Sequence, residues 1–211
     1  MQSGEWLDLL LSRKILENIT PAELHVGDRN AILIWLRATG YGPIYPINIV
    51  NPRTGKVIID PTTKKPYIHE IDLRELKTKK LGAEPDAGGY FIYQFPECGI
   101  PIKFRLLTVG DVEELEAIET YEKDALKLKY TNSNTHRLNR QIVEVDGNRN
   151  LDYIEDFIAN LRANDSREFK KYSDSIESGI DLNLEVRIPG GESINTFLPL
   201  NINFFWPDFR I

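Results

Sequence analysis

The sequence predicts an α+β fold in which helices pack on small antiparallel β-hairpins. Apolar residues recur at helical spacing in several segments, each of which begins with a Ser, Thr, Asp or Asn that can cap a helix. Between these segments, short runs rich in Ile, Val, Tyr and Phe are separated by turns that contain Pro and Gly. Residues 82–89 (GAEPDAGG) contain no large apolar side chain. We therefore predict an N-terminal helical lobe with a hairpin (1–81) and a C-terminal α+β lobe (82–211), with one continuous domain as the alternative.

The most apolar predicted helix begins at Asp28, whose carboxylate can accept hydrogen bonds from the free N–H groups of the first turn. The run AILIWL follows without a polar residue, so we expect a helix that is buried between other elements. Gly40 is expected to end the helix in the left-handed conformation, and Gly42, which precedes a proline, to prevent its continuation. Arg29 and Arg37 lie off the apolar run and are free to pair with carboxylates or chain ends of neighbouring elements.

Strands and turns follow this helix. Residues 44–50 predict a strand, residues 51–55 a tight turn, and residues 56–60 a strand that returns antiparallel. Residues 66–71 predict a third strand, and residues 73–80 (LRELKTKK) a short basic helix. The second half adds strands at 90–95 and 100–107, a helix from a Thr108 capping box to about Lys129, and a helix that Asn150 caps. Residues 136–145 predict a helix at first and, alternatively, a strand at 142–145.

An internal helix–hairpin duplication is an open alternative for the architecture. In the first copy, Asp28 caps a helix that Gly40 ends before a hairpin. In the second copy, Asp165 caps a helix that Gly179 ends before a hairpin at residues 181–200. A helix followed by a hairpin also recurs by chance, so we keep both interpretations.

Composition restricts the class of function. The chain of 211 residues has a net charge of −6, which argues against nucleic acid or an anionic membrane as the main partner. Its only cysteine excludes an internal disulfide and fits a reducing compartment. The N-terminus has neither the basic nor the long apolar region of a signal peptide, so we expect a cytoplasmic protein.

Motifs of known enzymes are absent, and we predict no catalytic, cofactor or metal site. One alternative is a small hydrolase or metal enzyme in which Cys98 is paired with His69. A second alternative places a metal or acid–base site on the acidic side of the 108–129 helix. We expect this side to be a helix face exposed to solvent. Its carboxylates are Glu113, Glu114, Glu116 and Glu119. A structural zinc ion needs four ligands, and one cysteine does not supply them.

Aromatic residues are the most distinctive local feature of the C-terminal end. Four of them fall within six residues, where they suit either a final core strand or a tail that docks on a partner. Together with two tyrosines after the central helix, they are the predicted partner-binding residues: Tyr41, Tyr45, Phe204, Phe205, Trp206 and Phe209.

The stretch GDRNAILIWLRATGYG, with the following hairpin and DLREL, resembles the baseplate hub proteins and hub assembly chaperones of T-even-like contractile-tailed bacteriophages. That family has an Asp-Arg-led helix that ends in Arg and Tyr-Gly, then two acidic-capped helices before a hairpin, and a closing Phe-Trp-Pro. The matching positions here are Asp28, Arg29, Arg37, Tyr41, Gly42, Asp165, Phe205, Trp206 and Pro207. Some relatives carry CxxC knuckles at their hairpins, where this chain has residues 51–55 and 188–192, so a metal-free hairpin is expected.

The resemblance implies a non-enzymatic protein that acts by protein–protein contact in the tail baseplate. It would be either a structural subunit of the hub or a chaperone of hub assembly. The implied partners are other baseplate and tail proteins in an oligomeric assembly, without nucleic acid, membrane or small-molecule substrate. The implied location is the host cytoplasm during assembly, and the virion if the protein stays in the tail.

Overall fold

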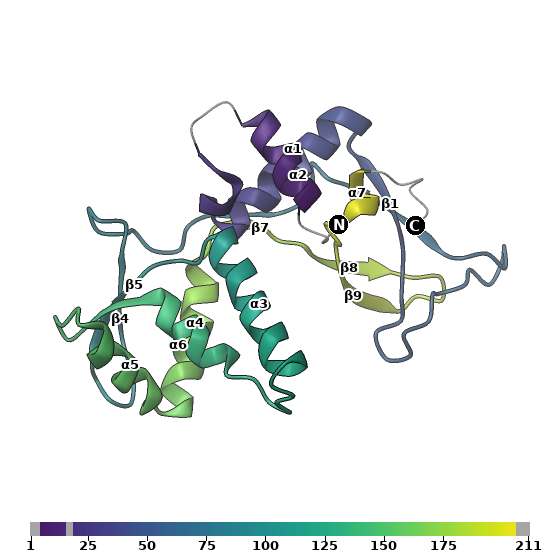
Figure 1. The fold of residues 1–211 in the computed structure, drawn as a ribbon. Helices are drawn as coiled ribbons and strands as arrows, with labels where there is room; N and C mark the ends of the chain where they lie inside the picture. The colour runs from purple at the N-terminus through teal and green to yellow at the C-terminus, as the bar shows by residue number, and fades with distance from the viewer. Residues whose placement is uncertain (1–4, 16–18, 206–211) are drawn as a thin grey trace. The chain divides into compact units, whose positions relative to one another are not determined.

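The computed structural model describes residues 5–15 and 19–205 (Figure 1). In chain order, its elements are α1 (Glu5–Lys14), the 3₁₀ helix η1 (Pro21–Glu23), α2 (Val26–Tyr41), β1 (Ile44–Asn48), β2 (Ile68–Asp72), β3 (Thr78–Lys79), β4 (Phe91–Gln94), β5 (Pro101–Phe104), α3 (Val109–Asp124), α4 (Ser133–Gln141), β6 (Ile142–Val145), α5 (Leu151–Ala159), α6 (Ala163–Ile176), β7 (Gly179–Ile180), β8 (Asn183–Arg187), β9 (Ser193–Phe197) and α7 (Ile202–Phe205). The strands form antiparallel sheets of two or three strands, which confirms the predicted α+β class.

The chain divides into two compact units that are each built from segments distant in sequence. Unit 1 consists of Met1–Trp6, Asn30–Lys79 and Gly179–Ile211, and unit 2 of Leu7–Arg29 and Lys80–Ser178. The predicted lobes, 1–81 and 82–211, share the division near residue 80. They do not include the return of the chain from unit 2 to unit 1 after residue 178, where β7 pairs with β3.

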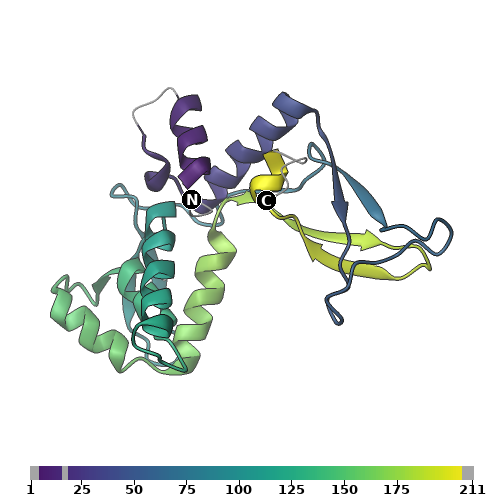
Figure 2. The ribbon, with the colours of Figure 1, turned by 45° about the vertical axis from the view of Figure 1, so that its right-hand side comes forward.

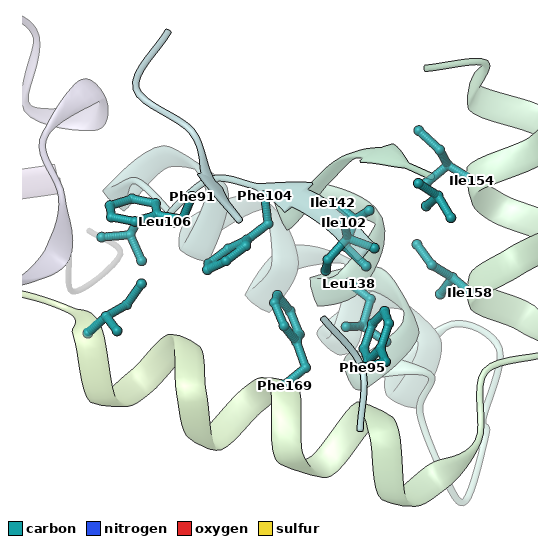
Figure 3. Close-up of a cluster of buried hydrophobic side chains, with 12 residues drawn as sticks. Phe91, Phe95, Ile102, Phe104, Leu106, Leu138, Ile142, Ile154, Ile158 and Phe169 are labelled. Carbon is teal, nitrogen blue, oxygen red and sulfur yellow. The ribbon is translucent and has the colours of Figure 1, made fainter. Parts of the chain in front are cut away.

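Unit 2 has a three-stranded antiparallel sheet in the order β4-β5-β6, and helices supply the rest of its core. Figure 3 shows Phe169 of α6 pointing toward Phe104 of the sheet, where the two rings meet edge to face at 4.9 Å between centroids. The fully or nearly fully buried members of this core are Phe91, Phe95, Ile102, Phe104, Leu106, Leu138, Ile142, Val145, Ile154, Ile158, Phe169 and Ile176. They all come from residues 80–178, so this segment contains the whole of the cluster, while the other segment of unit 2 adds the buried Leu7 and Leu11.

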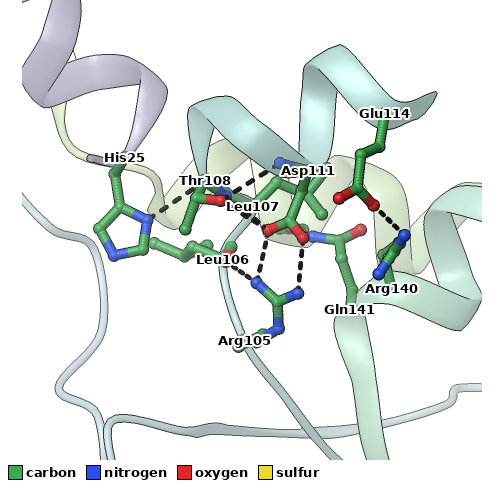
Figure 4. A network of polar contacts seen from close by, with 10 residues as sticks. His25, Arg105, Leu106, Leu107, Thr108, Asp111, Glu114, Arg140 and Gln141 are labelled. Atoms are coloured by element: carbon green, nitrogen blue, oxygen red, sulfur yellow. Dashed lines mark hydrogen bonds and ion pairs between the residues drawn. The ribbon is translucent and has the colours of Figure 1, made fainter. Parts of the chain in front are cut away.

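A polar network fixes the start of α3 (Figure 4). The predicted capping box is confirmed, because the Thr108 hydroxyl accepts the Asp111 N–H at 3.3 Å and the Asp111 carboxylate accepts the Thr108 N–H at 2.9 Å. Arg105 donates two further hydrogen bonds to that carboxylate, at 2.5 and 2.7 Å. The imidazole of His25 contacts the Leu107 carbonyl at 3.3 Å, which ties the segment before α2 to the same site.

Unit 1 is built on two hairpins, β1–β2 and β8–β9, which extend in the same direction in Figure 2. Side chains alternate along a strand, and one side of each hairpin is buried. The Tyr67 hydroxyl, just before β2, donates to the Arg187 carbonyl of β8 at 3.3 Å and links the hairpins. The buried apolar residues of this unit are Leu33, Ile34, Tyr45, Ile47, Ile49, Ile71, Leu73, Leu182, Val186, Ile194, Leu198, Phe204 and Phe205.

The loop between β1 and β2 contains one turn that occurs twice, nine residues apart. In the first turn the Asn51 side chain accepts from two backbone N–H groups, and in the second the Asp60 side chain does the same. Each turn then places one residue at positive φ, Gly55 at 68° and Lys64 at 57°. The predicted strand at residues 56–60 forms only isolated bridges, and the partner of β1 is β2. We call residues 44–72 the meander.

Two predicted roles in the central helix are wrong. The helix begins at Val26 because the His25 carbonyl already accepts its first hydrogen bond at 3.0 Å, so Asp28 lies inside the first turn and is not the cap. A carboxylate there still faces the positive end of the helix dipole. Gly40 belongs to the helix, and the left-handed residue that follows its end is Gly42, with φ of 93°.

Several other boundaries differ from prediction. The segment after Asp72 forms turns and β3, not a helix, since Arg74 binds the Asp72 carboxylate and β3 pairs with β7. Helix α3 ends at Asp124, five residues before the predicted end, whereas the predicted helix-to-strand change at 142–145 is confirmed. Helix α6 ends at Ile176, and Gly179 begins β7. In the proposed second copy of a duplication, α6 belongs to unit 2 and the following hairpin to unit 1, so they do not form one compact piece.

Candidate functional site

The meander has an apolar side that faces solvent. Residues at alternate positions of β1 and β2 share one side, and the bridges Val50–Val57 and Ile59–Pro66 continue that side through the loop. Its large aliphatic side chains are 41% to 57% exposed. We call this surface the outer face and define it by Ile44, Pro46, Val50, Val57, Ile59, Pro66 and Ile68.

An antiparallel hairpin that covers a core on one side normally carries polar residues on the other. Here the side toward the core is apolar at Tyr45, Ile47 and Ile49. The opposite side carries Asn48, Glu70 and Asp72 on the paired strands, but beyond the strands the two bridges of the loop add four apolar residues to it without a polar one between the partners. Single exposed apolar residues need no explanation, but a contiguous set of them is typical of a surface that binds a protein. The outer face is therefore the candidate binding surface of unit 1.

The outer face ends in a basic tip. Residues 51–66 contain four basic residues, Arg53, Lys56, Lys64 and Lys65, and one acidic residue, Asp60. Two hydrogen bonds from backbone N–H groups in its turn lower the pKa of Asp60. All four basic residues are exposed, although the whole chain has a net charge of −6. This local excess of positive charge favours a partner surface that is rich in carboxylates.

The predicted partner-binding aromatic residues differ in their exposure to solvent. Tyr41 is 55% exposed, whereas Tyr45, Phe204 and Phe205 are buried within unit 1. These three side chains belong to the core, where the rings of Tyr45 and Phe204 pack edge to face at 4.8 Å between centroids. Trp206 and Phe209 lie outside the described residues. The central helix is also less enclosed than predicted, and its indole at Trp35 is 63% exposed.

Arg37, for which carboxylates or chain ends were the expected partners, binds backbone carbonyls. Its Nε donates to the Phe204 carbonyl at 2.7 Å and a terminal nitrogen to the Gly42 carbonyl at 3.2 Å. The guanidinium also lies over the rings of Tyr41 and Tyr45, at 4.8 and 5.5 Å from their centroids. Arg37 thereby joins the end of α2 to the C-terminal helix α7.

Asp165, the predicted cap of α6, is a fully buried residue that binds another segment. Helix α6 begins at Ala163, and the two carboxylate oxygens of Asp165 accept the N–H groups of Glu97 at 2.9 Å and Cys98 at 3.3 Å. The carboxylate thus fixes the turn between β4 and β5 against the start of α6. Spacing along the sequence gave no sign of this pairing.

A cavity of about 380 Å³ lies beside this turn, and we call it the acidic pocket. Ile100, Phe157 and Leu161 form its apolar wall, and Asp156 and Asp165 contribute carboxylates. Cys98, Tyr153, Asn160 and Arg162 complete the lining. An apolar wall with a few polar groups is the usual composition of a site that accepts a side chain or a small ligand.

The residues of the enzyme alternatives do not come together within the described units. Cys98 is exposed in unit 2, and His69 belongs to β2 of unit 1, where its ring lies 6.4 Å from that of Tyr67. Along α3, Glu114 pairs with Arg140 and Glu119 with Lys123. The part of the chain that the structure describes has no group of three His, Cys, Asp or Glu side chains arranged to hold a metal ion.

The charge of Arg29 acts on the carboxyl group of Glu113. Burial raises the pKa of Glu113, the charge of Asp8 raises it further, and the charge of Arg29 lowers it. The Nε atom of Arg29 is buried and has no hydrogen-bond partner among the described residues. Glu116 is exposed on the same helix, so the four carboxylates form a charged helix surface with ion pairs, not a convergent set.

Sequence reasoning identified the strands of the meander but missed the outer face. Its signal was present, because the runs IYPINIV and VII are apolar at consecutive positions and not at alternate ones. Such runs are typical of strands covered on both sides.

Comparison of the chain with models of known protein families, with curated proteins and with solved structures finds no match. Among the described residues, no helix has both the length and the apolar composition needed to cross a membrane.

Proposed function

We propose that this chain is a non-enzymatic protein of the tail baseplate of a contractile-tailed bacteriophage, and that it acts by protein–protein contact. Its role is that of a hub subunit or of a chaperone that assembles the hub. The observation that carries the proposal is the outer face, an exposed apolar surface on a hairpin whose opposite side is already occupied by the core.

Two further features support a role in assembly. The hairpins of unit 1 have only two strands each, so every strand has an edge at which a partner strand can add. The resemblance in the sequence to hub proteins rests on residues in α2 and at the C-terminal end, and Arg37 connects these two places in the structure. Part of the resemblance therefore falls on a residue that stabilises unit 1, whereas Asp28, Arg29 and Asp165 belong to unit 2.

Quantitative mass spectrometry of purified tails and of unfinished assemblies tests this proposal. A fixed copy number per finished tail is expected for a hub subunit, and presence in unfinished assemblies only is expected for a chaperone. Absence from both would overturn the proposal.

The variant Ile68→Asp tests whether the outer face makes the contact. It places a charge at a 57% exposed position of the outer face, so it is expected to reduce incorporation without unfolding the chain. Ile92→Asp is the matched control, because Ile92 is also an exposed isoleucine on a strand but lies in unit 2. Equal incorporation of both variants would exclude the outer face as the contact surface.

A further inference from the structure

The acidic pocket has the chemistry to receive an apolar side chain that is flanked by basic groups. Its wall is apolar, and Asp156 offers it an exposed carboxylate. Buried Asp165, whose oxygens already accept two backbone N–H groups, contributes a second negative charge against the one basic residue of the lining, Arg162. Arg162 is also directed to Glu97, at 3.6 Å. Asp152, which is exposed, lies one helical turn before Asp156 on the same side of α5 and adds a further negative charge.

The basic tip offers the complementary arrangement on a projecting surface. Ile59 is half exposed and lies between two turns that carry Lys56, Lys64 and Lys65. No ion pair is recorded for these lysines or for Arg53 within the described residues. An aliphatic group surrounded by ammonium groups is what an apolar pocket with an acidic border would bind.

We propose that the basic tip of one copy of this chain docks in the acidic pocket of a second copy. The inference rests on the proposed function in one respect, namely that the outer face is a protein-binding surface. A second copy is the occupant that the charges support, because one chain carries both complementary halves, and the pocket of about 380 Å³ has room for an aliphatic side chain. A contact between two different surfaces of identical chains is heterologous and builds a ring or an open filament.

Sedimentation velocity of the purified full chain over a range of concentrations is the first experiment. Self-association is expected, and it should weaken as salt is added, since exposed charges on both surfaces are screened. A chain that stays monomeric at the highest soluble concentration and low salt overturns the proposal.

Variants of each surface then test the two halves. The tip variant is Lys56→Ser with Ile59→Ser and Lys65→Ser, and the pocket variant is Asp156→Lys; the changed positions are all exposed. Each is expected to weaken association by about tenfold or more. Each variant has a matched control that changes exposed residues of similar type elsewhere, and both controls are expected to leave association unchanged. The control for the tip variant is Lys80→Ser with Leu126→Ser and Lys170→Ser, and the control for the pocket variant is Glu84→Lys. Circular dichroism checks that all variants fold.

A mixture of the two weakened variants gives the decisive result. The pocket variant retains an intact tip, and the tip variant retains an intact pocket, so the mixture is expected to form a one-to-one heterodimer that does not grow further. A symmetric contact, in which the same surface of both copies meets, predicts no such rescue. Failure to form the heterodimer, or association that neither variant weakens, overturns the proposal. If this chain is nevertheless found in tails, the proposed baseplate function stands without self-association.

Discussion

Arg37 is a buried cation whose hydrogen bonds go to backbone carbonyl groups. Its planar guanidinium can donate in two directions while it stacks on the rings of Tyr41 and Tyr45. A lysine keeps the charge but not the fork, and an alanine leaves the Phe204 carbonyl without its donor. The stability of α7 therefore depends on a residue more than 160 positions earlier in the chain.

We predict that Arg37→Ala lowers the free energy of unfolding of unit 1 by ~2–4 kcal/mol, because it leaves a buried carbonyl unpaired. Urea unfolding measures the loss, and hydrogen exchange should show earlier opening at Phe204 and Phe205. Arg37→Lys is the control and should recover only part of the stability. Full recovery by lysine would mean that charge, and not the fork, holds the helix.

Asp111 gives the protein a specific dependence on pH. Burial raises the pKa of Asp111, but the hydrogen bonds from Arg105 and Thr108 outweigh it and lower the pKa from 3.8 to about 2. A group whose pKa is lower in the folded state contributes stability above its unfolded pKa, and that stability is lost as the pH falls toward the folded pKa.

We therefore expect the free energy of unfolding to fall by on the order of 2 kcal/mol between pH 4 and pH 2. This follows from the lowering of the Asp111 pKa from 3.8 to about 2. Chemical unfolding of the wild type and of Asp111→Asn at several pH values measures it. The variant should be less stable near pH 7 and should lose less stability over the same range. Parallel curves for both proteins would show that Asp111 does not carry the effect.

At the scale of an element, the repeated turn of the meander shows how two sequences form one geometry. NPRTGK and DPTTKK both place an Asn or Asp first, which binds the following N–H groups, and both need a residue at positive φ in the fifth position. Gly55 adopts this conformation without strain, whereas Lys64 has a Cβ atom and is strained there.

Substitutions at the fifth position of the two turns should therefore change the stability of unit 1 in opposite directions. Lys64→Gly is expected to raise the stability of unit 1 by ~0.5–1 kcal/mol, and Gly55→Ala to lower it by about 1 kcal/mol. No neighbouring atom lies near a Cβ built at Gly55, so its cost is conformational. Gly40→Ala, at a helical glycine with equal space, is the control and should not destabilise. Urea unfolding measures all three, and equal effects at Gly55 and Gly40 would contradict the explanation.

At the scale of the whole molecule, the chain leaves unit 1 near residue 80 and returns to it near residue 178. The ends of the intervening segment lie together, because the Gly82 N–H donates to the Ile176 carbonyl at 2.8 Å. A segment with adjacent ends and its own cluster of buried apolar side chains has the properties of an independent domain.

We predict that residues 80–178 fold when they are expressed alone. Without residues 7–29, the fragment loses the hydrogen bond from the Val109 N–H to the Leu24 carbonyl, so the start of α3 should be its least stable part. Dispersed NMR signals and a cooperative thermal transition are the expected observations. A fragment with helical circular dichroism but no cooperative transition would show that residues 7–29 are needed for the core to pack.

The sequence by itself determined the fold class, the capping box at Thr108, the cap at Asn150 and the change from helix to strand before Ile142. These features depend on neighbours within about four residues, so local spacing is sufficient to predict them. The predicted roles of Asp28 and Gly40 were wrong by a few residues, because the His25 carbonyl accepts the first hydrogen bond of the helix and Gly42 is the left-handed residue after its end.

Only the tertiary structure decided which distant segments meet. Asp165 binds a turn 67 residues earlier, and Arg37 binds the Phe204 carbonyl. Strand β3 pairs with β7, although about 100 residues separate them in the sequence. The same holds for the candidate surfaces, since the outer face depends on which side of the meander the core covers. Burial of a side chain and pairing between distant residues are determined by packing of the whole chain, for which spacing along the sequence has no signal.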